Sequence, residues 1–297
     1  MNKIFQTIKN LSDAKKMSFL FVVIAQFIVL FNYSIVRSLA GTMFAMSVGV
    51  KDRPLAAFVA FFVILICVSI INQLQKKISV QKIFAGISVL TFGTMALAYF
   101  LFKYSPAFSA YLINVVQNAY IVFLIHLIIG YSNEVFSLDE KKLLYGTMGA
   151  IASVGSVLGG LLTSEISSII SYIPSLHLFV ANTFYSSMIP FNKEDTSHFL
   201  FVISLFFYLF PIIFFLKSHI KDSLQPILEK NKPEEKPSPF ASLKGVWGYV
   251  ILIAVLISLT QFLVLFADQK FFLTLSEKAL SPDAMTSYQG RMYSMIN

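Results

Sequence analysis

The stretch from Pro54 to Leu74 reads PLAAFVAFFVILICVSIINQL and contains no charged residue over 21 positions. A bilayer core of about 30 Å needs about 20 consecutive apolar residues in a helix, because hydrocarbon cannot satisfy unpaired backbone groups. The stretch is therefore predicted to be a membrane-spanning helix. Six other apolar blocks are predicted spans of the same kind: Met17 to Arg37, Ile83 to Phe102, Tyr111 to Tyr131, Leu143 to Ser164, His198 to Leu216 and Gly248 to Phe266.

The composition agrees with these blocks. Of 297 residues, 57% are hydrophobic and 13% are charged, whereas soluble domains carry about a quarter charged residues. A soluble globular fold is excluded, and we expect an all-α membrane protein, a polytopic bundle of about seven spans in contact with the lipid bilayer. The net charge of +8 does not indicate a nucleic-acid partner, because the basic residues lie in short segments between the apolar blocks.

The distribution of those basic residues predicts the orientation. With the N-terminus in the cytoplasm, fifteen of the 23 Lys and Arg residues fall in predicted cytoplasmic segments and eight on the opposite side. The positive-inside rule therefore favours an integral, multi-pass protein with a cytoplasmic N-terminus.

A polar, Pro-rich segment from Lys217 to Gly245 interrupts the apolar blocks and is predicted to be a cytoplasmic linker. Six spans, a long linker and a further span are typical of a six-plus-six transporter. We expect the chain to contain the first half and the start of the second. The rest of the C-terminal half is then either separately encoded or missing. The predicted parts are an N-terminal segment 1–16, a six-span half 17–216, a linker 217–247 and an incomplete second half 248–297.

The first span contains Tyr33 and Arg37 on one helix face. An arginine at membrane depth is costly and usually faces a cavity or a partner, and its planar guanidinium suits phosphate or carboxylate. An anionic substrate is one interpretation. The other is that Arg37 ends the span and extends its charge to the interface.

Two further spans carry polar side chains. Asn114, Gln117 and Asn118 share one face of the fourth span, where amides either join helices or line a polar cavity. The seventh span carries Gln261, and Asp268 follows just after it on the same helix face. One interpretation is that Asp268 pairs with a cation. The other is that the helix ends at Asp268, Gln269 and Lys270, whose side chains then lie in water.

Glycines mark the fifth span as a packing helix. Gly155 and Gly159 form a Gly-x-x-x-Gly pair, and Gly149 and Gly160 belong to the same small-residue stripe. Small residues allow two helix backbones to approach closely. The stripe also resembles the fifth-helix glycine motif of major facilitator antiporters, with Ser156 in the position of its proline.

No motif in the sequence indicates an enzyme: there is no helical His-Glu-x-x-His, no phosphate-cradling loop with its lysine and no nucleophile elbow. The single Cys67 lies inside a predicted span, which leaves no cysteine-based metal site. We expect no enzymatic activity, no cofactor and no metal.

Several short motifs occur in a particular order along the chain. They are NYSIVR at 32–37, GYSNE at 130–134 with DEKKLLY at 139–145, and SPD at 281–283 with YQG at 288–290. This order resembles the ATP:ADP antiporter family, nucleotide translocases of intracellular bacteria and plastids that are distant relatives of the major facilitator superfamily. The resemblance implies a bundle of major facilitator type in a bacterial inner membrane, exchanging nucleotides or another anionic metabolite by alternating access.

Two departures from the family pattern accompany these matches. The family's Asp-x-Lys-Asp positions are occupied here by Ser38 to Gly41, and its fourth-helix acidic residue falls near Asn118. The alternative is therefore a non-transporting or truncated membrane scaffold that keeps the fold without the charged site. Spans and resemblance together give the predicted substrate-binding set: Asn32, Tyr33, Arg37, Gln117, Asn118, Asn133, Lys142, Gln261 and Asp268.

Overall fold

The computed structural model describes residues 8–172, 196–217, 247–278 and 281–296, and within these ranges all regular structure is helical. Six helices are long and apolar enough to cross a membrane. The elements are α2 (Asp13–Ser47), η1 (Val50–Asp52), α3 (Arg53–Leu74), α4 (Val80–Leu101), α5 (Pro106–Val135), α6 (Leu138–Tyr172), α8 (Thr196–Phe207), α9 (Phe210–Lys217), α12 (Trp247–Glu277) and α13 (Pro282–Ile296).

The first predicted span is longer than expected at both ends. It was predicted over 17–37, but α2 runs from Asp13 to Ser47, with Ser12 at its N-cap. Residues 13–16 therefore belong to this helix and not to a separate N-terminal segment. The helix also continues for ten residues beyond Arg37, so this residue does not end the span.

The sixth predicted span is broken in the middle. Residues 199–216 are apolar enough to span, but a turn at Tyr208 and Leu209 separates α8 from α9. Pro211 explains the break, because proline has no N–H to donate to the carbonyl of Phe207, four residues earlier. Beyond it, the N–H of Ile212 donates to the Leu209 carbonyl at 3.1 Å, a tighter turn than that of an α-helix.

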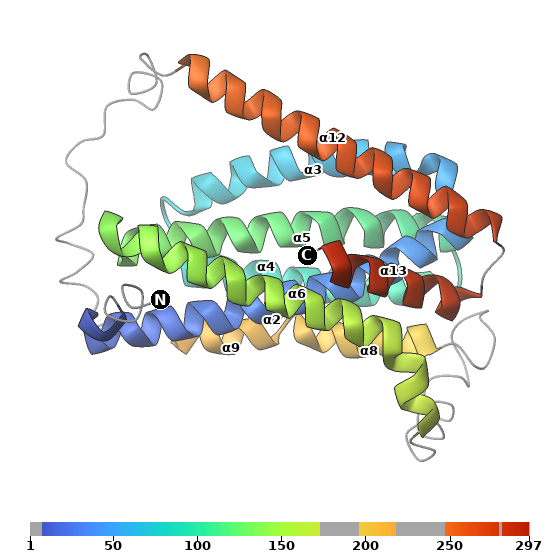
Figure 1. Cartoon of the computed structure of the whole chain (residues 1–297), viewed down its shortest axis with the longest axis horizontal. Helices are drawn as coiled ribbons and strands as arrows, with labels where there is room; N and C mark the ends of the chain where they lie inside the picture. The colour runs from blue at the N-terminus through green and yellow to red at the C-terminus, as the bar shows by residue number, and fades with distance from the viewer. Residues whose placement is uncertain (1–7, 173–195, 218–246, 279–280, 297) are drawn as a thin grey trace.

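The described helices form an elongated bundle (Figure 1), and α2 is the helix that contacts most of the others. It packs against α5, α6, α8, α9 and α13. By contrast, α3 lies at the edge and exposes large apolar side chains, among them Phe58, Phe61 and Ile66. Such a surface suits contact with lipid.

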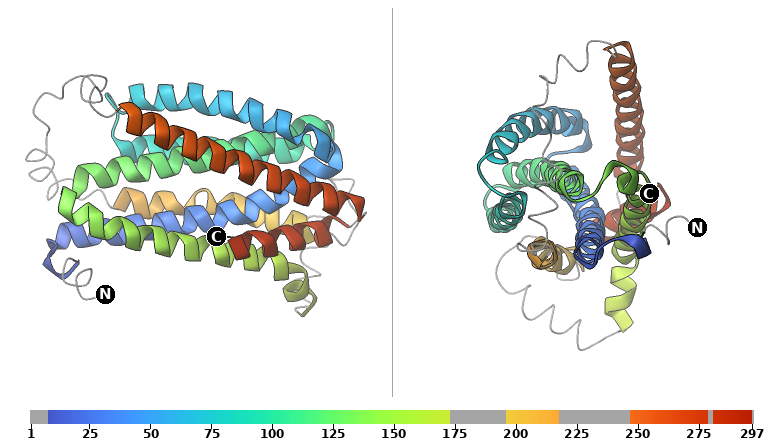
Figure 2. Two further views of the ribbon diagram at one scale, coloured as in Figure 1. Left: turned by 45° about the horizontal axis from the view of Figure 1, so that its top comes forward. Right: turned by 90° about the vertical axis from the view of Figure 1, so that its left-hand side faces the viewer.

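The seventh predicted span, 248–266, lies within the 31-residue helix α12. Figure 2 shows α12 standing apart from the bundle along most of its length and approaching it near the C-terminal end. Along the part that stands apart, the described apolar side chains of α12 are exposed, including Leu259 and Leu263. That α12 spans a membrane stays a prediction, and the proposed linker before it lies outside the described residues.

The glycines of α6 hold two neighbouring helices at close range. A Cβ added to Gly155 would lie 2.5 Å from the carbonyl oxygen of Phe27, and one added to Gly159 would overlap that of Phe31, both on α2. Gly160 faces α13, where an added Cβ would lie 2.7 Å from the Gly290 carbonyl oxygen. These contacts are backbone against backbone, as expected of small residues in helix crossings.

Gly149 differs from the other three predicted packing glycines. No atom of the described residues lies within 4 Å of a Cβ built on it. Gly149 is therefore not one of the close-contact positions of α6.

An ion pair joins the beginning of α2 to the beginning of α6. Lys15 Nζ lies 2.7 Å from Glu140 Oε2, and both side chains are mostly shielded from solvent. The same carboxylate accepts the backbone N–H of Ser137 at 2.7 Å, which satisfies one of the free donors at the start of α6.

We expect Glu140→Gln to lower the free energy of unfolding by about 1–2 kcal/mol, because it weakens a charge-assisted hydrogen bond and the contact with Ser137. Unfolding in mixed micelles of rising SDS content measures this change. The matched control is Asp139→Asn, since the Asp139 side chain is 94% exposed. Equal stability of the two variants would contradict the prediction.

Candidate functional site

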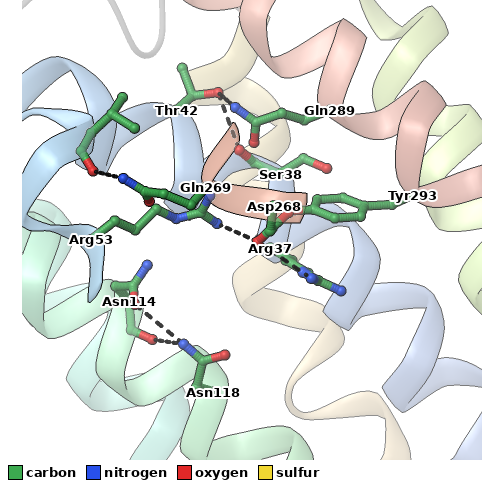
Figure 3. Close-up of polar contacts among 11 residues, drawn as sticks. Arg37, Ser38, Thr42, Arg53, Asn114, Asn118, Asp268, Gln269, Gln289 and Tyr293 are labelled. Atoms are coloured by element: carbon green, nitrogen blue, oxygen red, sulfur yellow. Dashed lines mark hydrogen bonds and ion pairs between the residues drawn. The ribbon is translucent and has the colours of Figure 1, made fainter. Parts of the chain in front are cut away.

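Arg37 lies inside the bundle, with its side chain 23% exposed. Its guanidinium carbon lies 4.0 Å from the ring centroid of Tyr293 on α13 and 5.9 Å from that of Tyr33. Its Nη2 atom lies 3.7 Å from Asp268 Oδ2 on α12. Three helices thus meet around this one charge (Figure 3).

A second arginine, which the sequence analysis did not single out, reaches the same carboxylate. Arg53 is the first residue of α3, and its Nη2 atom lies 3.1 Å from Asp268 Oδ2. Its guanidinium carbon sits 3.4 Å from the ring centroid of Phe272. Pro54 was the available signal, because proline in the first turn marks a helix start and therefore a fixed position for Arg53.

Asp268 is the centre of the cluster. Besides the two arginines, its Oδ1 atom accepts the hydroxyl of Tyr293 at 3.1 Å, and its side chain is 11% exposed. The neighbouring Gln269 donates to the carbonyl of Val50 in η1 at 2.9 Å, which ties this part of α12 to the start of α3. Of the two interpretations of Asp268, the geometry matches the cation partner.

The cluster carries an unbalanced charge. Arg37 and Arg53 supply two positive charges and Asp268 one negative charge. Among the described residues, the buried Nη1 atom of Arg53 has no hydrogen-bond partner. A shielded guanidinium with a free donor favours an additional anion, because burial makes uncompensated charge costly.

Figure 3 also draws Asn114 and Asn118, two of the polar side chains of α5. Asn114 and Gln117 are buried. Asn118 donates to the backbone carbonyl of Asn114 at 2.8 Å and to its side-chain oxygen at 3.2 Å. These bonds stay within α5, while Gln117 Oε1 has no partner among the described residues. Among the described residues, these hydrogen bonds do not join α5 to a neighbouring helix.

Asn32, five residues before Arg37 on α2, is fully buried. Neither polar atom of its side chain has a hydrogen-bond partner within the described ranges. Buried amides without partners are rare, and they usually mark a bound water or a ligand position. No contact among the described residues joins Asn32 to Arg37 or Asp268, so its part in the site stays a prediction.

Two predicted site residues lie far from the others. Lys142 is exposed and pairs with Asp139 at 3.4 Å, and Asn133 accepts the hydroxyl of Tyr145 at 2.7 Å. Both lie at the end of the bundle where Glu140 meets Lys15. Arg37 follows Lys15 by 22 residues on α2, so the distance along the helix axis from that end of the bundle to Arg37 is about 33 Å.

The structure therefore does not bring Asn133 and Lys142 together with Arg37, and their role in substrate binding stays a prediction. Those two positions came from motif order along the chain, which does not fix depth in the bundle. Gln261 lies in α12, but its side chain falls outside the described part of the structure.

The positions that depart from the antiporter pattern are tightly packed. A Cβ on Gly41 would lie 2.6 Å from the Phe272 ring and 2.7 Å from Gln289 Oε1. Beside it, Thr42 accepts the side-chain N–H of Gln289 at 3.1 Å and the hydroxyl of Thr286 at 2.9 Å. The contacts between α2 and α13 at this level are thus made by neutral side chains.

No family model matches the chain, and comparison with curated proteins and with solved structures finds no match either. The cluster of Arg37, Arg53 and Asp268 is therefore the main physical ground for a functional assignment. Its two guanidiniums can bind a phosphate or carboxylate through parallel N–H donors, and its rings can flank the bound group.

Proposed function

We propose that this chain forms part of a membrane transporter for an anionic metabolite, most like a nucleotide, which it exchanges by alternating access. The observation that carries the proposal is the convergence of Arg37 and Arg53 on the single carboxylate of Asp268 inside a helical bundle. This leaves one positive charge unbalanced and one buried guanidinium donor free among the described residues.

The position of the cluster supports movement of the bound anion. Arg37 comes from α2, Arg53 from α3 and Asp268 from α12, on the two sides of the predicted linker. Binding sites between two halves of a transporter can open to either side when the halves rock. The anion then contacts both halves, and its binding energy links their motion.

Nucleotides are the favoured substrate class within this proposal for two reasons. Their phosphates match the guanidinium forks of Arg37 and Arg53. The order of motifs along the chain also resembles that of ATP:ADP antiporters. The orientation proposed with it has a cytoplasmic N-terminus in a bacterial inner membrane, which the distribution of Lys and Arg supports.

A non-transporting scaffold is the alternative, and the packing around Gly41 favours it. At that level, Phe272 and Gln289 fill the space that charged side chains would need. In a scaffold, the arginines and Asp268 only hold α3, α12 and α2 together, and no ligand enters.

Ligand binding to the purified chain in detergent decides between the two. We expect ADP and ATP to raise the midpoint of thermal unfolding, because a ligand at about 100 times its Kd stabilises the native state by about 2.7 kcal/mol. Adenosine is the matched neutral ligand and should give no shift. A shift with neither nucleotide would favour the scaffold, and an equal shift with adenosine would exclude the arginines as the cause.

A further inference from the structure

The carboxylate of Asp268 occupies the place where a ligand anion would bind. Its Oδ2 atom lies 3.1 Å from Arg53 Nη2 and 3.7 Å from Arg37 Nη2, and its Oδ1 atom accepts the Tyr293 hydroxyl. Carboxylate and phosphate oxygens bind guanidinium donors in the same way. The groups that would hold a ligand are therefore those that already hold Asp268.

The same carboxylate helps to attach α12 to the bundle. Within the described part of α12, the ion pairs, the Gln269 hydrogen bond and the cation–π contact with other elements involve Asp268, Gln269 and Phe272, all near its C-terminal end. Closer to its N-terminal end, Leu259 is exposed and the helix stands away from the bundle (Figure 2). Of these three contact residues, Asp268 alone carries a charge.

We propose that Asp268 is an internal competitor of the substrate anion: it sets the affinity of the site, and its displacement by a bound phosphate group releases α12 from Arg37 and Arg53. This inference rests on the proposed function. It adds a role for Asp268 that opposes ligand binding, whereas a ligand-binding residue would favour it.

The charges also define the class of anion. With Asp268 in place, the cluster has one net positive charge, but a ligand that displaces the carboxylate meets two arginines. A terminal phosphate with two negative charges balances them, and a monocarboxylate does not. The site should therefore prefer phosphate esters and pyrophosphate to monocarboxylates.

The first test measures the Kd of ADP by calorimetry on the detergent-solubilised chain. Asp268→Asn removes the competing charge and keeps the side-chain shape, so we expect its Kd for ADP to fall at least about tenfold. Asp268→Glu should stay within about threefold of wild type. Glu277→Gln, which changes an exposed acid on the same helix, is the matched control and should leave the Kd unchanged.

Weaker or unchanged ADP binding by Asp268→Asn, when wild type binds, would overturn the competitor role and leave the proposed function standing. Absence of ADP binding by the wild-type chain would instead remove the proposed function. The two failures are thus separate.

A second measurement follows the position of α12 and uses the wild-type cluster, so it does not depend on how Asp268→Asn folds. Spin labels are placed on exposed positions of α12 and α5 through Leu259→Cys and Val122→Cys, in a Cys67→Ser background. We expect ADP or pyrophosphate to shift the label-to-label distance by several ångströms. A distance that stays unchanged on saturation with either anion would overturn the release of α12.

The ligand-free arm of the same measurement compares wild type with Asp268→Asn. If Asp268 holds α12, the variant should show the shifted distance without any anion. An unshifted distance in a folded variant would contradict the attachment role, whatever the wild-type chain binds.

Discussion

Arg37→Ala is expected to weaken ADP binding at least about 100-fold, while the chain still inserts and folds. Each charge-assisted hydrogen bond to a phosphate contributes about 1.5–3 kcal/mol, and the guanidinium of Arg37 can make two of them. The fold should persist because Asp268 keeps Arg53 and Tyr293 as partners. The measurements are the Kd of ADP in detergent and the elution volume on size exclusion.

The matched control for this variant is Lys51→Ala. Lys51 lies in η1, two residues before Arg53, and its side chain is exposed. The Lys51→Ala substitution therefore removes a positive charge from the same end of the bundle without removing a shielded donor. Similar losses of affinity in both variants would show that general electrostatic attraction, and not the guanidinium cluster, governs binding.

The second large effect is expected from Gly159→Ala, which should lower the free energy of unfolding by at least about 2 kcal/mol. The added methyl group would overlap the backbone carbonyl of Phe31, and a backbone cannot move aside as a flexible side chain can. The helices α2 and α6 must then separate along their contact. Unfolding in SDS mixed micelles gives the magnitude.

Gly149→Ala, in the same helix, is the control, and it should not lower the free energy of unfolding. Open space surrounds that position in the described structure, and alanine has the higher helix propensity by about 1 kcal/mol. We expect this variant to be as stable as wild type or slightly more so. A destabilised Gly149→Ala, or a neutral Gly159→Ala, would contradict the packing described for α6.

The helical class is the part of the fold that the sequence predicts securely, and the structure confirms it in the described residues. Continuous apolar blocks leave few alternatives, because only helices and closed barrels satisfy the backbone in hydrocarbon. The break at Pro211 was also readable, since a proline inside an apolar block removes one helical hydrogen bond.

The site was only partly predictable. Arg37 and Asp268 were recognisable as charges at the edges of apolar blocks. Arg53 was missed because a cation before Pro54 was counted as part of a loop on the outer side. The partnership of these residues depends on how α2, α3 and α12 approach one another, and one-dimensional periodicity contains no such information.

Asn133 and Lys142 show the limit of motif order as a guide to which residues share a site. Motif order placed them in the site, but the depth of a residue depends on its distance along each helix from a common end. The contact of Lys15 with Glu140 fixes that end for both α2 and α6. A depth comparison from predicted span boundaries would have placed Lys142 near Lys15 and far from Arg37.

The crossing of α6 and α13 at Gly160 and Gly290 also has a consequence for biosynthesis. These residues are separated by 130 positions in the chain. At 5–20 residues per second, a ribosome needs on the order of ten seconds to add that much chain. During this interval Gly160 lacks its partner on α13, whereas Gly155 and Gly159 face α2, which precedes α6 in the chain.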